Sequence, residues 1–113
     1  MIAVIFESQP HPGKKDAYLG AAAGLRSQLE KMDGFLSIER FESLTQPGKL
    51  LALSFWRDEE AVRQWRNNEA HLRVQESSRR SIFADYRLRV AQVVRDYGMN
   101  ERDQVPEDSW RAR

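Results

Sequence analysis

The order of strand-like and helix-like patterns is the feature that most constrains the fold of this chain. Runs rich in β-branched and aromatic residues occupy residues 2–8, 35–43, 50–56 and 86–97. Amphipathic segments with apolar residues every three or four positions follow the first and the third run. A chain of 113 residues has room for one domain. The six segments therefore predict one β-α-β-β-α-β unit.

That order predicts an α+β, ferredoxin-like βαββαβ fold, in which a four-stranded antiparallel sheet carries both helices on one face. The first helix is expected over residues 14–32, before the helix-ending pair Asp33-Gly34. In the strand that follows, alternation predicts Leu36 and Ile38 on one side, with Phe35 and Phe41 on the other.

The second helix is expected to begin at the acidic run of residues 58–60. Carboxylates at this position can accept hydrogen bonds from the free N–H groups of a first helical turn and interact favourably with the helix dipole. Its expected buried stripe consists of Ala61, Val62, Trp65 and Leu72. Asn67 and Asn68 are poor helix formers, so they mark a kink or a second capping point.

Apolar residues fall on both faces of several strands, so the helices cover only part of the apolar surface of the sheet. An uncovered apolar sheet face is typical of an interface. We therefore expect a homodimer that packs sheet against sheet and buries roughly 2,000 Å² or more in total.

Composition excludes several functional classes. The net charge is +1 with 31% charged residues, which argues against a nucleic-acid or membrane-surface protein. The chain has no cysteine, and no His-x-His or similar spacing indicates a metal site. The first ten residues lack a basic segment and do not form a signal peptide, so we expect a cytoplasmic protein. Phosphate- and dinucleotide-binding glycine motifs are absent.

The stretch WRNNEAHLRVQ (residues 65–75) holds one of only two histidines. On a regular helix His71 would lie about 240° from Trp65, at the edge of the buried stripe. His71 is either a general acid/base or a boundary histidine that caps a neighbour. The side chains expected to line an apolar pocket between sheet and helices, unless they are simply core, are Phe6, Trp65, Phe83 and Tyr86, with Asn67, Asn68, His71 and either Arg87 or Arg89 as polar groups.

Several short motifs resemble one known family. They are SFWRDEEA (residues 54–61), Trp65-Arg66, Glu69-Ala70-His71, Ile82-Phe83, YRLRVA (residues 86–91) and RDYG (residues 95–98). Together they are similar to the antibiotic biosynthesis monooxygenase (ABM) domain of the dimeric α/β-barrel superfamily. The resemblance covers residues 1–98, which we expect to form the domain, and leaves residues 99–113 as a polar tail.

The resemblance implies a homodimer whose two sheets form a barrel, with an apolar pocket in each subunit. It also implies a cofactor-independent monooxygenase that acts on a small aromatic or quinol-like compound, so no cofactor is expected. Trp65 matches the helix tryptophan of the family. On this hypothesis His71 is the acid/base, Arg87 or Arg89 stabilises a phenolate, and Trp65, Asn67, Asn68, Tyr86, Phe6 and Phe83 bind the substrate.

Two alternatives remain open. Haem-degrading relatives use an asparagine on the first strand and a histidine about ten residues after the helix tryptophan. Here Glu7 or Ser8 and Gln75 occupy those places, which disfavours haem degradation. The other alternative is a non-catalytic ligand-binding or stress-associated dimer. The tail is either a disordered end or, through Trp110, an anchor on the partner subunit.

Overall fold

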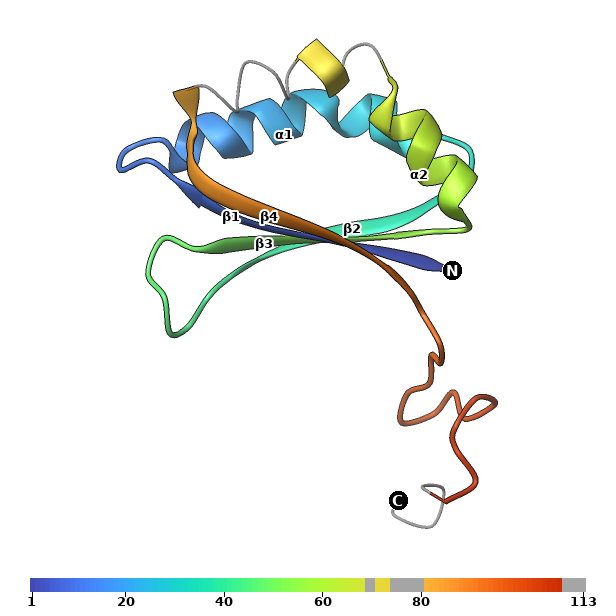
Figure 1. Ribbon diagram of the computed structural model, residues 1–113. Helices are drawn as coiled ribbons and strands as arrows, with labels where there is room; N and C mark the ends of the chain where they lie inside the picture. Colours follow the sequence, from blue (N-terminus) through green and yellow to red (C-terminus); the bar gives the residue numbers. More distant parts are fainter. Residues whose placement is uncertain (69–70, 74–80, 109–113) are drawn as a thin grey trace.

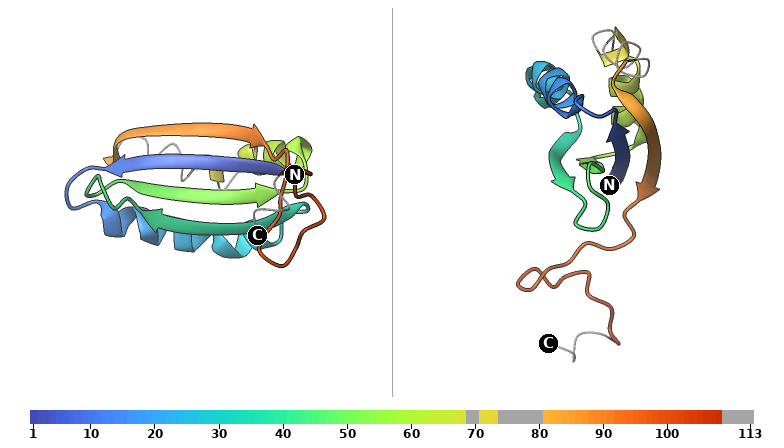
Figure 2. Two further views of the ribbon diagram at one scale, coloured as in Figure 1. Left: turned by 90° about the horizontal axis from the view of Figure 1, so that it is seen from below. Right: turned by 90° about the vertical axis from the view of Figure 1, so that its left-hand side faces the viewer.

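The computed structural model describes residues 1–68, 71–73 and 81–108, and it confirms the predicted ferredoxin-like fold. The elements are β1 (Ile2–Pro10), α1 (Lys15–Glu30), β2 (Phe35–Glu42), β3 (Leu50–Trp56), α2 (Glu59–Arg66) and β4 (Phe83–Gln92). Both helices lie on one face of the sheet, and the other face is left open (Figure 1). The four antiparallel strands follow the order β2-β3-β1-β4, so β2 and β4 form the edges (Figure 2).

The strand register assigns side chains to the two faces of the sheet. Ile2 lies opposite both Trp56 and Gln92, so the even-numbered residues of β1, of β3 and of β4 from Tyr86 onward share the face that carries the helices. A register shift between Gln9 and Pro10 puts Phe83 on this face as well. The main core on this face comprises Ile2, Leu29, Trp56 and Ala61. We call the opposite face, which has no helix over it, the outer face.

The last strand differs from its predicted bounds of residues 86–97. It begins earlier, at Phe83, and ends earlier, at Gln92. The reason is that β4 is an edge strand of the four-stranded sheet and pairs with β1, which begins at Ile2. Beyond the hydrogen bond from the Val93 N–H to the Met1 carbonyl, at 2.9 Å, the described residues offer β4 no further strand to pair with. Val94, expected on a strand face, lies past this end.

The predicted alternation in β2 is wrong at its start. The register with β3 shifts between Phe35 and Ser37, which places Phe35 and Ile38 together against the helix-side core. Leu36 is instead 54% exposed. A bulge of this kind inserts one residue and reverses the side on which the following residues project.

The second helix is shorter than expected. Asp58 caps its start, because its Oδ1 accepts the Ala61 N–H at 2.9 Å, and the hydrogen-bonded Asp58 carboxyl has a lowered pKa. The helix ends at Arg66, and the break predicted at Asn67-Asn68 is confirmed. Leu72 therefore leaves the expected buried stripe and is 44% exposed.

Beyond β4 the chain leaves the sheet on the side away from the helices (Figure 1). In the part of the chain that the structure describes, no helix combines the length and apolar character needed to cross a membrane. Gln75 and Trp110 lie outside the described residues.

Candidate functional site

Trp65 and His71 form a stacked pair at the end of α2. Their rings are 4.6 Å apart between centroids and inclined by 17°. Nδ1 of His71 lies 3.1 Å from the Trp65 carbonyl oxygen. Because a carbonyl oxygen only accepts hydrogen bonds, Nδ1 carries the proton, and Nε2 is the basic atom of the neutral ring. The interaction that orients the ring thus also determines its tautomer.

Two asparagines maintain the break that makes this pairing possible. The side-chain N–H of Asn67 donates to the Arg63 carbonyl at 2.9 Å and closes the last turn of α2. The Oδ1 of Asn68 accepts the His71 N–H at 3.1 Å and begins the next helical turn. The spacing argument that separated Trp65 from His71 assumed an unbroken helix and is wrong. In these positions the carboxamides of Asn67 and Asn68 bond to the backbone.

Burial lowers the pKa of His71, while the hydrogen bond to the Trp65 carbonyl opposes this shift. An imidazole with a lowered pKa is neutral at pH 7, and a neutral imidazole can accept a proton. The geometry therefore suits His71 to act as a base through Nε2.

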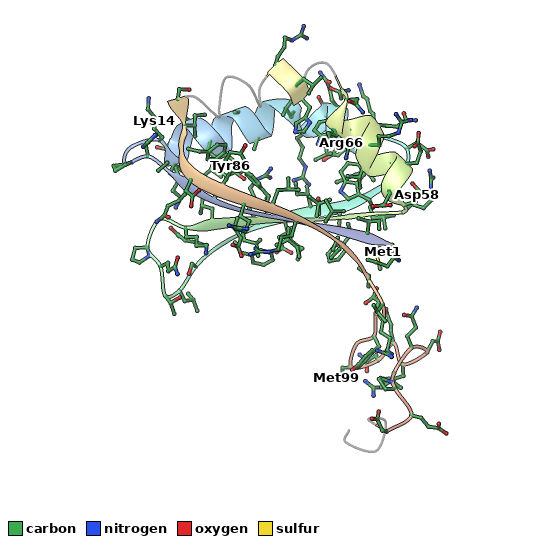
Figure 3. The ribbon with its side chains drawn as sticks, in the orientation of Figure 1. Met1, Lys14, Asp58, Arg66, Tyr86 and Met99 are labelled. Atoms are coloured by element: carbon green, nitrogen blue, oxygen red, sulfur yellow. The ribbon has the colours of Figure 1, made fainter. Side chains whose placement is uncertain are left out.

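An apolar strip runs along the helix-facing side of β4, where Tyr86, Leu88 and Val90 are 38%, 49% and 44% exposed. Figure 3 labels Tyr86 between the sheet and α1. In the register these three side chains lie beside Ser8, Phe6 and Val4 of β1. Alternate residues over this stretch span about 13 Å, comparable to a fused aromatic system of two or three rings.

Aromatic side chains lie at both ends of this strip. At the Tyr86 end, the Phe6 ring is 5.6 Å from both Phe83 and Tyr86. At the Val90 end, Trp65 packs on the core group that includes Ile2 and has Val4 at its side. The predicted lining residues Phe6, Phe83, Tyr86 and Trp65 therefore belong to two separate groups, connected by the strip.

Arg87 and Arg89 lie on the outer face. Their odd numbers place them opposite Glu7 and Ile5, and Nη1 of Arg89 lies 3.4 Å from Glu7 Oε2. The expectation that either arginine projects between sheet and helices is wrong, because residues two apart on a strand always share a face. The structure therefore separates both from His71.

The arginine that faces the helices is Arg40 on β2, which the sequence argument overlooked. Its Nε donates to the Tyr18 hydroxyl at 3.4 Å, and its guanidinium carbon lies 5.8 Å from the centre of the Tyr18 ring. Tyr18 in turn packs 5.4 Å from Phe83. A cation two residues after the inward-facing Ile38 was the available signal.

Ser8 is a second polar group on the helix-facing side. It is 2% exposed, and among the described residues its Oγ has no hydrogen-bond partner. No group of three or more His, Asp or Glu side chains within the described ranges is placed to hold a metal ion.

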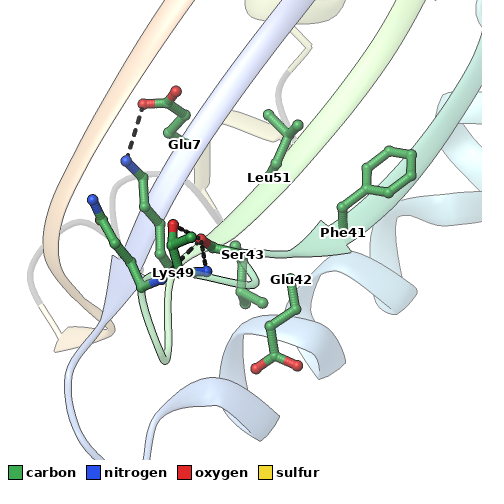
Figure 4. A pocket seen from close by; sticks show the side chains of 9 residues that line it. Glu7, Phe41, Glu42, Ser43, Lys49 and Leu51 are labelled. Atoms are coloured by element: carbon green, nitrogen blue, oxygen red, sulfur yellow. Dashed lines mark hydrogen bonds and ion pairs between the residues drawn. The ribbon is translucent and has the colours of Figure 1, made fainter.

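Two surface hollows of about 310 Å³ lie away from the strip. One is on the outer face beside the β2–β3 loop, where Lys49 Nζ lies 3.6 Å from Glu7 Oε2 (Figure 4). The other lies between α1 and β2, over Leu19 and Arg40. Neither hollow includes His71 or Trp65.

Comparison with curated proteins finds a relative named jasmonate monooxygenase ABM in the fungus Pyricularia oryzae. The two are 46% identical over 101 residues, which is 89% of this chain and 47% of the relative. The chain thus spans about half the length of this relative.

Solved structures share the fold at low sequence identity. Rv0793 from Mycobacterium tuberculosis superposes with a TM-score of 0.76 at 18% identity, covering 86% of this chain and 98% of that one. A variant of SnoaB, a cofactor-independent oxygenase from Streptomyces nogalater, gives 0.73 at 13% identity, covering 84% and 94%.

A family model matches the segment that contains β1 to α2, the Trp65–His71 pair and the break between them. The match covers residues 1–77, about two thirds of the chain, and confirms the resemblance seen in the sequence. The chain belongs to the antibiotic biosynthesis monooxygenase (ABM) family.

Proposed function

We propose that this protein is a monooxygenase that oxidises a small phenolic or quinol-like aromatic with dioxygen. The observation that carries the proposal is the half-buried Trp65–His71 pair, in which Nε2 of His71 is the basic atom. Membership of the ABM family supports the reaction class. The apolar strip on β4 supports a flat, apolar substrate.

The proposed reaction converts a phenol and O₂ into a quinone and water. His71 Nε2 accepts the phenol proton, and the resulting phenolate transfers electrons to dioxygen. A C–O bond forms at the para carbon, which later loses its hydrogen as a proton. The O–O bond then breaks, and the leaving hydroxide takes up a proton to become water. The substrate supplies all four electrons that reduce O₂ to one quinone oxygen and one water, so this stoichiometry balances without a separate reductant.

We also propose that the protein acts as a homodimer, joined through the outer face. This face presents partly exposed apolar side chains: Ile5, Leu51, Leu53, Phe55 and Phe41. Burying such a face against its copy removes apolar surface from water, which favours association by about 25 cal/mol per Å² before the costs of association.

Oxygen uptake with a panel of anthrones and of dihydroxynaphthalenes that carry a hydrogen para to a hydroxyl group tests the proposal. With ¹⁸O₂, one labelled atom is expected in the quinone and the other in water. His71→Ala is expected to slow turnover at least about a hundredfold, the lower end of what general acid–base catalysis contributes. Turnover that is unchanged in His71→Ala would remove His71 from the mechanism. An absence of enzyme-dependent oxygen uptake would overturn the proposal for these substrates.

A jasmonate-type cyclopentanone carboxylate is the second substrate candidate, because of the 46% identical relative named for that substrate. Oxygen insertion into a saturated C–H bond consumes two electrons from a donor. The same assay with jasmonate, with and without NADPH, separates this candidate from the phenol. Oxidation of jasmonate alone would replace the aromatic proposal.

The non-catalytic alternative predicts ligand binding without oxygen uptake, which calorimetry on the same panel would detect. Haem degradation predicts a shifted Soret band on titration with haem, followed by its loss when a reductant is added.

A further inference from the structure

We propose that residues 93–108 form an arm that docks on the outer face of a second copy of this chain. This inference rests on the homodimer proposed above. The arm begins where β4 loses its last backbone hydrogen bond to Met1. It runs on the side of the sheet away from the helices, as two views show (Figures 1 and 2). A second sheet packed on the outer face would occupy that side.

The arm has a defined local shape. Hydrogen bonds between arm residues hold its central part, including one of 3.2 Å from the Val105 N–H to the Arg102 carbonyl. Three further bonds measure 2.8 Å. They run from the Gly98 N–H to the Glu101 carbonyl, from Arg102 Nη1 to the Gly98 carbonyl, and from the Asp96 N–H to Gln104 Oε1. The Arg102 guanidinium also lies 5.5 Å from the centre of the Tyr97 ring. This part of the arm is therefore a folded turn.

The arm carries apolar side chains that its own domain does not cover. Val94 is 77% exposed, Tyr97 43% and Met99 86%. Three such side chains close together on a short polar segment are typical of a contact surface.

Reach and charge fit the outer face. Sixteen residues can span up to about 50 Å, whereas packed sheets lie about 10 Å apart. Residues 93–108 contain five acids and two arginines. The outer face carries Lys49, Arg87 and Arg89, and among the described residues no ion pair occupies Arg87. Arg87 on the outer face of the second copy is therefore available to form an ion pair with a carboxylate of the arm.

Cross-linking between copies tests the contact, because the chain has no cysteine of its own. Met99→Cys would be made in one tagged chain, and Arg87→Cys or Ser37→Cys, both on the outer face, in a chain with another tag. Ser27→Cys on the exposed side of α1 is the matched control. A mixed disulfide is expected with at least one outer-face position and not with Ser27→Cys. A dimer that forms neither outer-face cross-link would overturn the proposal.

Sedimentation of the full-length chain measures the contribution of the arm. Replacing Val94, Tyr97 and Met99 together with serine is expected to weaken dimerisation at least tenfold. Leu44→Ser, at a fully exposed leucine in the β2–β3 loop, is the control. Unchanged dimerisation in the triple variant would overturn the arm and leave the homodimer standing. An unmodified chain that stays monomeric at all concentrations would overturn both.

Discussion

Trp65 and His71 are linked twice: His71 Nδ1 donates a 3.1 Å hydrogen bond to the Trp65 carbonyl, and the two side-chain rings stack. Each contact restricts a different freedom of the imidazole. The hydrogen bond determines which nitrogen carries the proton, and stacking determines the plane of the ring. A base with both restrictions is preorganised, so little reorganisation is needed when it accepts a proton.

The pH dependence of activity follows from the lowered pKa of His71. If neutral His71 is the base, kcat/KM should be constant near pH 7 and should fall on the acid side, with an apparent pKa below 6.5. Oxygen uptake between pH 4.5 and 8 measures this profile. His71→Gln should remove the acid limb together with most of the rate. An acid limb that persists in the variant would assign the limb to another group.

The pH dependence of stability provides a check that needs no substrate. Because burial lowers the pKa of His71 in the folded state, the unfolded chain binds more protons as pH falls below about 6.5. The contribution of His71 to the free energy of unfolding is therefore complete above about 6.5, and it is lost as pH falls through the lowered pKa. Urea titrations should show this loss in the native chain and in His11→Gln. Equal acid sensitivity in His71→Gln would contradict it.

The fold could be predicted because hydrophobic periodicity is a local property of the sequence. The pairing of Trp65 with His71 could not, because it depends on the break at Asn67-Asn68. The low helix propensity of the two asparagines predicted the break, but it did not predict that the break would bring the two rings together. The outer-face position of Arg87 and Arg89 follows from the pairing of β4 with β1, which is a tertiary contact. Arg40 shares a face with Ile38, two residues earlier, but it is the packing of Ile38 on the helix-side core, a tertiary contact, that shows this face to be the one toward the helices.

Substrate contact along β4 predicts a selective effect of Leu88→Ala. Leu88 is 49% exposed on the helix-facing side, so its loss should remove ligand contact with little loss of core packing. We expect kcat/KM to fall roughly tenfold, the lower end of what a missing methylene contact costs in an apolar pocket. Leu36→Ala, at a leucine 54% exposed on the opposite edge strand, is the matched control. Equal losses in both variants would contradict a substrate site on the strip.

The buried hydrogen bond from Trp56 Nε1 to Ser54 Oγ, 2.9 Å long, predicts a coupled effect on stability. Ser54→Ala leaves the Nε1–H of Trp56, a side chain that is 2% exposed, without an acceptor. This loss should lower the free energy of unfolding by about 1–3 kcal/mol. In a Trp56→Phe background the donor is already absent, so the same change should cost less. Denaturant unfolding of the four proteins gives the coupling energy. Additive costs would show that the bond contributes nothing to stability.

Gly34 connects the turn after α1 to the first turn of α2. Its φ is +86°, and a Cβ added there would lie 2.6 Å from the Cβ of Ala61, which is 3% exposed. Gly48 has a similar φ of +83°, but a Cβ added to it would meet nothing within 4 Å. Gly48→Ala should therefore show only the backbone cost, about 1 kcal/mol, whereas Gly34→Ala should exceed about 2 kcal/mol in urea unfolding. Because the clash displaces α2, Gly34→Ala should also lower kcat/KM through the Trp65–His71 pair. Equal destabilisation by the two substitutions would show that α2 shifts away from the added Cβ without loss of free energy of unfolding.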